Sequence, residues 1–384
     1  MIQKTFYLGN LILKLFLICL RKIPTIYTQN SQMCYNTHMK KDLKVLAIES
    51  SCDETSCAVV VDGRTCLSNI VSSQIDIHTL FGGVVPEVAS RNHITAIDNV
   101  VKLALVKANC TMADIDVIAV TYGAGLIGSL LVGVSYAKAL AYATKKPLVA
   151  VNHIYGHIAG NYLSSAELVP PFVCLIVSGG HTAIVKVEDY NHHTLIGTTL
   201  DDAVGECFDK VARVLGLGYP GGPKVSKLAE TGKPNIQFAR PNDSLGYNFS
   251  FSGKKTAVIN YIHKLEQAGK EIPKADICAS FEHWAVDELV EKAIKACKQY
   301  GINQLAIAGG VSANRYLREQ MSLKAEQNGI KFYMPKMDYC TDNAAMIGSA
   351  GYYAYVAGIG IADMTLAPNP SLSLDDYLLK TNKE

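Results

Sequence analysis

Two stretches of the sequence share one local pattern, and this repetition constrains the fold more than any other feature. Residues 44–63 (KVLAIESSCDETSCAVVVDG) and 171–190 (PFVCLIVSGGHTAIVKVEDY) each contain an apolar run, a small polar turn and a second apolar run. Apolar runs separated by small turn residues are typical of β-hairpins. Two similar hairpins indicate a diverged internal duplication, and they predict two similar lobes that face one another.

The remaining segments alternate between helical and extended patterns. Residues 86–108 and 125–143 have helical apolar spacing, whereas 116–123 (DVIAVTYG) and 148–151 (LVAV) are short apolar runs typical of buried strands. The chain has 384 residues, of which 49% are hydrophobic and 18% charged, so it can bury large cores and divide into two or three domains or lobes. We therefore expect an α/β protein.

Small residues form the turns after several apolar strands. In Ser178–Thr182 (SGGHT), glycines and hydroxyl groups let backbone N–H groups approach an anion, although such turns also arise for conformational reasons alone. Residues 304–319 (QLAIAGGVSANRYLRE) predict a strand, a glycine turn and a helix capped by Ser312 or Asn314. A helix N-terminus is an anion site, and Asn314 is alternatively a hydrogen-bond partner for a ribose. The glycine turns predict a nucleotide held between lobes. Without GxxxxGK[ST], a P-loop is not expected, and the GxGxxG match at 216–221 (GLGYPG) follows a predicted helix and not a strand, so a standard dinucleotide fold is not expected either.

Two histidines lie four residues apart in 149–160 (VAVNHIYGHIAG). On a helix, His153 and His157 share one face about one turn apart, which suits two imidazole ligands of a metal ion. Buried or helix-capping histidines give the same pattern. Asp342 precedes an Ala-rich helix and is either its N-cap or a third ligand. A set of two histidines and one carboxylate suits Fe(II) or Zn(II).

Residues 198–222 predict a helix in their middle, because apolar residues recur there at four-residue steps. Within it, Asp209 and Lys210 are interpreted as a solvated pair. The Gly221-Gly222 turn that follows can approach a ligand. Residues 250–258 (SFSGKKTAV) add hydroxyl groups and two lysines that are candidates to face phosphate or RNA.

Charge is distributed unevenly along the chain. Residues 1–41 hold six lysines and arginines and no acidic residue, so residues 42–384 carry 30 basic against 34 acidic side chains. This balance excludes a broadly basic nucleic-acid binder, and a nucleic-acid partner must meet a local patch or be docked by another protein. The eleven cysteines show no CxxC spacing, which indicates reduced thiols in a cytosolic compartment.

The first 41 residues do not continue the α/β pattern. Residues 8–20 are apolar but contain Lys14, and the run is too short to span a membrane. A signal-like segment, an organellar presequence and an upstream in-frame start with the true start at Met39 are the alternatives. The third is favoured, because no small-residue cleavage site follows and the segment is not Arg- or Ser-rich. We expect a chain begun at Met39 to stay soluble and active.

Over residues 44–367 the chain resembles the tRNA N6-adenosine threonylcarbamoyltransferase family, formerly called O-sialoglycoprotein endopeptidases, and is most similar to its bacterial type. Nine motifs occur in the same order as in that family. They are LAIESSCDETS (46–56), FGGVVPEVASRNH (81–93), VNHIYGH (151–157), LIVSGGHT (175–182), GECFDKVAR (205–213), GYPGG (218–222), FSFSGKKTA (249–257), GGVSANRYLR (309–318) and TDNAAMIG (341–348).

The resemblance implies an actin-like, Hsp70-like ATPase (ASKHA) fold with duplicated β-hairpin lobes. An N-terminal lobe over 44–151, with part of 343–367 packing back on it, would follow the extension 1–41, and a C-terminal lobe over 152–342 would carry the site. The resemblance also implies one divalent metal ion per subunit, Fe(II) or else Zn(II), and a bound threonylcarbamoyl-adenylate. The implied metal ligands are His153, His157 and Asp342, and the implied adenylate-binding residues are Ile176, Val177, Ser178, Gly179, Gly180, Asp209, Gly222 and Asn314.

The family transfers the threonylcarbamoyl group of that adenylate to N6 of the adenosine 3′ of the anticodon, in tRNAs that read codons beginning with adenine, and AMP is released. By resemblance, the expected partners are tRNA, a synthase that supplies the adenylate, a degenerate paralogue that forms a heterodimer, and a small accessory ATPase. The expected location is the cytoplasm, without a membrane. In the first hairpin turn, Asp53 and Glu54 are candidates for general-base or orienting work, or they serve the turn itself.

The chain departs from the family pattern at three positions. Ser226 stands where many relatives have an Asp that contacts substrate, Ala124 where many have Pro, and Tyr155 where Glu is frequent. A metalloprotease, which the old family name suggests, needs HExxH, and here Ile154 follows His153. An actin-like sugar kinase or regulatory ATPase is the alternative function, because the same lobes bind ATP; it would need no set of two histidines and an aspartate.

Overall fold

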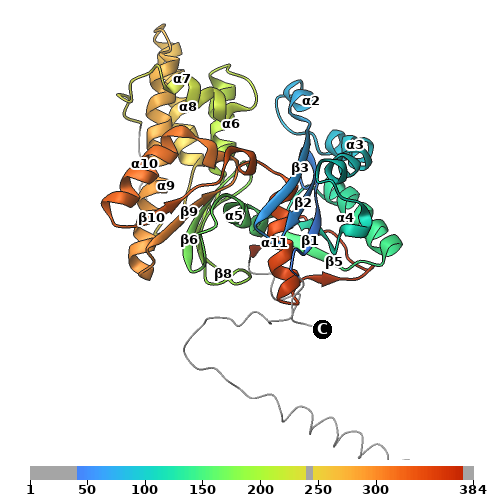
Figure 1. Ribbon diagram of the computed structural model, residues 1–384. Coiled ribbons are helices and arrows are strands. Elements are labelled where there is room, and N and C mark those ends of the chain that lie inside the picture. Colours follow the sequence, from blue (N-terminus) through green and yellow to red (C-terminus); the bar gives the residue numbers. More distant parts are fainter. Residues whose placement is uncertain (1–40, 239–244, 375–384) are drawn as a thin grey trace, which may run out of the picture. The chain divides into compact units, whose positions relative to one another are not determined.

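The computed structural model describes residues 41–238 and 245–374, so the predicted start at Met39 lies outside the described residues. The described strands form two mixed sheets with a common plan (Figure 1). In each sheet a central strand pairs parallel with a later strand on one side and leads into two antiparallel strands on the other. The duplication predicted from the two hairpins is therefore confirmed.

The first sheet has the strand order β11-β5-β4-β1-β2-β3. Its hairpin β1–β2 is the first predicted one, and every described residue of β4 and β5 is buried, as the continuous apolar runs predicted. The strands are β1 (Lys44–Glu49), β2 (Glu54–Val61), β3 (Thr65–Ser73), β4 (Val117–Gly123), β5 (Leu148–Asn152) and β11 (Ile361–Ala362).

The second sheet has the order β10-β9-β6-β7-β8. Alternate residues of its central strand enter different cores: Val173, Leu175 and Val177 pack with α6–α9, whereas Phe172 and Ile176 join the core shared with the first sheet. This alternation follows from the period of two in a strand. The strands are β6 (Phe172–Val177), β7 (Thr182–Val187), β8 (His193–Thr198), β9 (Gln304–Ala308) and β10 (Lys331–Tyr333).

Helices cover both sheets (Figure 1). In the first half of the chain, α3 packs on β2 and β3, and α4 packs on β4. In the second half, α9 packs on β6 and β9, and α6, α7, α8 and α10 surround it. The helices are α2 (Ile75–Thr79), α3 (Pro86–Lys107), α4 (Ile127–Thr144), α5 (His153–Ser164), α6 (Val204–Val214), α7 (Gly221–Ala229), α8 (Ser252–Gln267), α9 (Lys274–Tyr300), α10 (Arg315–Gln327) and α11 (Ala344–Val356), with short 3-10 turns η1 (Met112–Asp114), η2 (Gly310–Ala313) and η3 (Met337–Tyr339).

Two helices connect the sheets and position the site described below. Helix α11 packs on the first sheet and on α5, and α5 in turn contacts β6 and β9 of the second sheet. Close approach depends on glycine: a Cβ at Gly351 would lie 2.6 Å from Cβ of Ala119, and one at Gly348 would lie 2.7 Å from Cγ2 of Val60. Residues 343–356, near the end of the chain, thus lie against strands from its beginning.

Among the described residues, helix α4 is long and apolar enough to cross a membrane by length and composition alone. One third of it is buried, and it packs against β4 and α3 as part of the first core.

Candidate active site

The two histidines of the HxxxH pattern lie in the first turns of α5. The buried strand β5 ends at Asn152, whose side chain accepts a hydrogen bond from the Ile154 N–H at 2.8 Å and so begins the helix. His153 and His157 are 6% and 1% exposed, and their rings lie 4.6 Å apart at 82°. The helix thus aims two buried imidazoles from one face, as the spacing predicted.

Asp342 meets both histidines in space. Its Oδ1 lies 3.2 Å from Nε2 of His157 and 3.5 Å from Nε2 of His153. The alternative role as N-cap is wrong, because the side chain of Asn343 caps α11 by accepting from the Met346 N–H at 3.1 Å. The short segment before α11 therefore separates the two functions: one residue caps the helix and its neighbour turns toward α5.

The chemistry of this cluster fits a divalent metal ion. One ligand atom from each of the three side chains can be chosen so that all lie within 4.8 Å of one another. The imidazole of His157 is buried, and neither ring nitrogen has a well-oriented hydrogen bond among the described residues, although Nε2 lies 3.2 Å from Oδ1 of Asp342; a cation between these two atoms would satisfy both. Burial lowers the pKa of His153, but the negative charges of Asp342 and Glu49 outweigh burial and hold this pKa well above its usual value. The cluster therefore favours positive charge at this position.

Glu49 is a residue that the sequence-based prediction missed. It ends β1, it is fully buried, and its Oε2 lies 3.1 Å from Nδ1 of His153. Ser51 Oγ is also 3.1 Å from the same nitrogen. The only sequence signal was one acidic residue at the end of an otherwise apolar strand.

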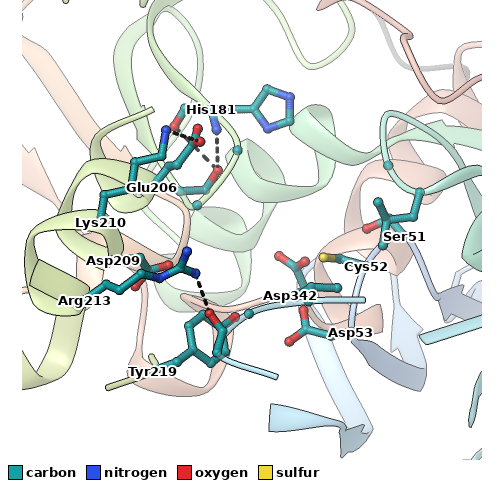
Figure 2. A pocket seen from close by; sticks show the side chains of 18 of the residues that line it. Ser51, Cys52, Asp53, His181, Glu206, Asp209, Lys210, Arg213, Tyr219 and Asp342 are labelled. Atoms are coloured by element: carbon teal, nitrogen blue, oxygen red, sulfur yellow. Dashed lines mark hydrogen bonds and ion pairs between the residues drawn. The ribbon is translucent and has the colours of Figure 1, made fainter. Parts of the chain in front are cut away.

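A cavity of about 750 Å³ opens beside the cluster. Figure 2 shows Asp342 and the first hairpin turn on one side of it, with Asp209, Arg213 and Tyr219 facing them from α6 and the loop that follows. Arg213 donates a hydrogen bond to the Gly82 carbonyl at 2.7 Å and so links the two sides. The cavity is lined by Ser51, Cys52, Asp53, Gly82, Gly83, Val84, Ala124, Gly125, Leu126, His153, Ser178, Gly179, Gly180, His181, Glu206, Asp209, Lys210, Arg213, Gly216, Gly218, Tyr219 and Asp342.

The turn Ser178–Gly180 faces this cavity. The Ser178 hydroxyl accepts from the His181 N–H at 3.0 Å, and the Ser178 carbonyl accepts from the Gly205 N–H at 3.2 Å, in the first turn of α6. A Cβ at either Gly179 or Gly180 would meet no atom within 4 Å, so their backbone is open to a ligand. A glycine turn beside a helix N-terminus can hold an anion.

The other predicted adenylate-binding residues occupy two places. Ile176 and Val177 are fully buried inside β6, so only their backbone is near the turn. Asp209 lines the cavity and is not a solvated partner of Lys210: its Oδ1 accepts from the N–H groups of Gly221 and Gly222 at 2.7 and 3.3 Å. Burial raises the pKa of Asp209, and the two N–H groups oppose that rise.

Asn314 and Gly222 do not line the cavity, but they extend the same region. Gly222 and Ser226 are one turn apart on α7, and the Asn314 amide donates to the Ser226 hydroxyl at 2.8 Å and to Oε1 of Glu282 at 2.7 Å. Ser226 also donates to Glu282 at 2.6 Å. A half-buried polar patch thus runs from Asp209 along α7 to the start of α10.

Asp53 and Glu54 occupy different environments. Asp53 lines the cavity near Asp342 (Figure 2). Glu54 begins β2 and accepts a hydrogen bond from Ser73 at 3.0 Å. Burial raises the pKa of Glu54 to about 10, and the charges of Asp53 and Asp342 add to the rise. This environment favours the neutral form of the Glu54 carboxyl.

The two lysines of 250–258 both form ion pairs with carboxylates of the chain. Lys254 is buried, pairs with Glu288 at 2.6 Å and stacks on Trp284, and Lys255 pairs with Asp202 at 2.8 Å. Lys254 is therefore not accessible to phosphate or RNA, whereas contact of the partly exposed Lys255 with either stays a prediction. Arg213, which lines the cavity, was not singled out from the sequence, and His181 was considered only as part of the Ser178–Thr182 turn.

Comparison with known proteins gives the family. A model of the tRNA N6-adenosine threonylcarbamoyltransferase family matches residues 65–349. A protein of that name from Clostridium novyi is 57% identical over 341 residues, which cover 88% of this chain and all of that protein. Another from Clostridium botulinum is 55% identical over 339 residues, which cover 87% of this chain and 99% of that protein.

Solved structures show the fold. HypF of T. kodakarensis has a TM-score of 0.57 at 14% identity and matches 83% of this chain and 48% of its own. A full-length HypF in its phosphate- and nucleotide-bound form has a TM-score of 0.54 at 16% identity, over 83% and 47% of the two chains. These likenesses confirm the two-lobed actin-like α/β fold, and the relatives do not favour the sugar kinase or regulatory ATPase. The chain belongs to the tRNA N6-adenosine threonylcarbamoyltransferase family.

Proposed function

We propose that this chain transfers a threonylcarbamoyl group from threonylcarbamoyl-adenylate to N6 of the adenosine 3′ of the anticodon, in tRNAs that read codons beginning with adenine. The observation that carries this proposal is one cavity lined both by the His153 and Asp342 cluster and by the Ser178–Gly180 turn. Metal ligands and an anion-binding turn beside one space suit an acyl phosphate donor. The relatives over 50% identical carry the name of this activity.

The reaction moves one acyl group. The N6 nitrogen forms a bond to the carbamoyl carbon, the bond from that carbon to the phosphate oxygen breaks, AMP leaves with the electron pair, and N6 loses a proton. An exocyclic adenine amine is a weak nucleophile, so alignment and polarisation are both required. A metal ion bound to His153, His157 and Asp342, Fe(II) or else Zn(II), would supply a Lewis acid for the carbonyl or the phosphate.

The chain's own residues orient the donor. The open backbone of Gly179 and Gly180 at the start of α6 would hold the phosphate, and the Asn314 amide with Gly222 would contact the nucleoside. Asp53 is the better candidate to accept or orient the N6 proton, because it lines the cavity whereas Glu54 is bound to Ser73.

The proposed partners follow from chemistry and surface. A mixed anhydride hydrolyses in water, so a synthase must supply it close by. Apolar side chains are exposed on α3 and α4, among them Ile94, Val106 and Leu131, and this surface suits a heterodimer with a degenerate paralogue. A small accessory ATPase is proposed from the resemblance alone. The cysteines in the described part of the chain are free thiols, which supports a cytoplasmic location.

Mass spectrometry of tRNA nucleosides tests the function. Depletion of this protein is expected to remove threonylcarbamoyladenosine, and the wild-type chain is expected to restore it. A His157→Ala chain should fail to restore it, because an imidazole ligand is lost, whereas Lys324→Ala, on the exposed face of α10, should restore it fully. An unchanged nucleoside level after depletion would reject the proposal.

A further inference from the structure

Glu49 is a fully buried carboxylate next to the proposed metal site. It ends β1 at the point where the chain turns toward β2, between the neighbouring strands β2 and β4. A buried carboxylate is stable only when hydrogen bonds replace its hydration. Its partners therefore show what the position is built to do.

Two donors and one ring nitrogen meet the two oxygens of Glu49. The Ser51 N–H donates to Oε1, the Thr121 hydroxyl donates to Oε2 at 2.6 Å, and Nδ1 of His153 lies 3.1 Å from the same Oε2. Ser51 and Thr121 come from different segments, so they fix the carboxylate from two directions. These two hydrogen bonds position the carboxylate independently of its contact with the imidazole.

This contact determines where the proton of a neutral His153 lies. An ionised carboxylate only accepts hydrogen bonds, so the Nδ1 facing Glu49 must carry the N–H. The other nitrogen, Nε2, then presents its lone pair toward Oδ1 of Asp342, 3.5 Å away. A lone pair and a carboxylate oxygen aimed at one point repel each other unless a proton or a metal ion lies between them, and a bound metal ion would take the place of the proton.

We propose that Glu49 is a positioning residue that holds His153 as the Nδ1–H tautomer and directs its Nε2 to the metal ion. The proposal rests on the metal site of the proposed function. Carboxylates that accept from the distal N–H of a ligating histidine orient the ring and raise its basicity, and their loss weakens metal binding by about 10- to 100-fold.

The test compares two buried carboxylates changed in the same way. In Glu49→Gln, either orientation of the amide turns an NH₂ group toward one set of donors, toward Ser51 or toward Thr121 and His153. Zn²⁺ affinity, measured by competition with a chelator, should fall about 10-fold or more. The matched control is Glu282→Gln, because Glu282 is buried and bonded to Ser226 and Asn314 but to no proposed metal ligand. Its Zn²⁺ affinity should equal that of the wild type.

The tautomer provides a second readout that needs no variant. In the zinc-loaded wild-type protein with ¹⁵N-labelled histidine, NMR should show the proton of His153 on Nδ1; a proton on Nε2 would overturn the proposal even where Glu49→Gln fails to fold. Unchanged Zn²⁺ affinity in a folded Glu49→Gln protein would also overturn it. If the wild-type chain binds no zinc or Fe²⁺, the metal site of the proposed function fails, and the positioning role fails with it.

Discussion

Asn314 joins the start of a helix to a buried carboxylate. Its Oδ1 caps α10 by accepting from the Leu317 N–H at 2.8 Å, and its amide group donates to Glu282 and Ser226. One side chain therefore both begins the helix and holds a buried carboxylate. In the proposed function the same amide lies next to the nucleoside, which makes its replacement informative.

We expect Asn314→Ala to weaken AMP binding about 10-fold, as measured by calorimetry, and to leave tRNA affinity nearly unchanged. Loss of the cap should also lower the free energy of unfolding by about 1 kcal/mol. Asn314→Ser, which keeps a capping oxygen but loses the amide, separates the two effects: it should recover stability and not AMP affinity. Equal losses of AMP and tRNA affinity would count against the placement of the nucleoside.

His193 is a buried histidine with an unusual environment. Its ring lies 4.0 Å from that of Tyr155, and both of its nitrogens are buried without a hydrogen-bond partner among the described residues. Burial lowers the pKa of His193 to about 3, although Asp189 nearby raises it and His192 lowers it further. The folded protein thus keeps this imidazole neutral down to acidic pH.

The lowered pKa of His193 makes the folded state less stable as the pH falls. Between the ordinary histidine pKa of 6.5 and about 3, the unfolded chain binds a proton at His193 and the folded chain does not. Acidification across this range should therefore destabilise the folded state by up to roughly 1.4 kcal/mol per pH unit. His193→Phe keeps a ring beside Tyr155 but cannot be protonated. In urea titrations from pH 7 to pH 4, its stability should fall less steeply than that of the wild type; parallel curves would contradict the assignment.

At the scale of elements, α11 depends on glycine for its contact with the first sheet. A methyl group at Gly351 would lie 2.6 Å from Cβ of Ala119, which belongs to a rigid buried strand. We expect Gly351→Ala to lower the free energy of unfolding by about 1–3 kcal/mol, as overpacking in cores does. Because Asp342 lies next to Asn343, the N-cap of α11, the shift of the helix should also weaken Zn²⁺ binding.

Gly160 in α5 provides the control. A Cβ there would approach the Tyr339 carbonyl at 3.4 Å and Met346 Cβ at 3.7 Å, which are ordinary contacts. Gly160→Ala should therefore be neutral or stabilise the protein by up to about 1 kcal/mol through helix propensity. Chemical denaturation of both variants measures the difference. Equal effects of the two substitutions would show that close packing of α11 does not limit stability.

The elements themselves could largely be predicted from local sequence. Strands and helices place apolar residues with different periods, which made it possible to predict the hairpins at 44–63 and 171–190 and the helix at 86–108. The structure has β1–β2, β6–β7 and α3 at these places. The two sheets then follow from the repeated pattern. Even the alternation along β6 is what a strand buried on both faces requires.

Contacts between distant segments could not be predicted in the same way. Asp342 and Asn343 are both good helix caps, and only the packed structure shows that Asn343 caps while Asp342 reaches α5. In the sequence Glu49 looks like an ordinary strand end, and only the folded structure shows that Thr121 and His153 contact its carboxylate. Lys254 looked exposed because lysine usually is, but Glu288 and Trp284 hold it inside.

At the scale of the whole folded region, Arg64 links the two sheets. It lies in the turn between β2 and β3 of the first sheet. Its guanidinium donates to the hydroxyls of Tyr353 and Tyr190, which lie in α11 and after β7, and its carbon lies 4.8 Å from the centre of the Tyr162 ring. It also donates to the carbonyls of Ser165 and Leu168, between α5 and β6.

The Arg64 side chain thus provides four hydrogen bonds to segments that pack on the two sheets. The substitution Arg64→Met should remove all four bonds and keep most of the apolar stem. We expect the free energy of unfolding in urea to fall by about 2–4 kcal/mol, because buried acceptors lose a charged donor. The control is Arg91→Met: Arg91 pairs with Glu87 at 2.7 Å, but their side chains are 77% and 75% exposed. That substitution should change stability by less than about 1 kcal/mol, since exposed ion pairs contribute little. If the two variants unfold at the same urea concentration, Arg64 has no special part in joining the sheets, and the contacts of α5 and α11 and the shared apolar core hold them together.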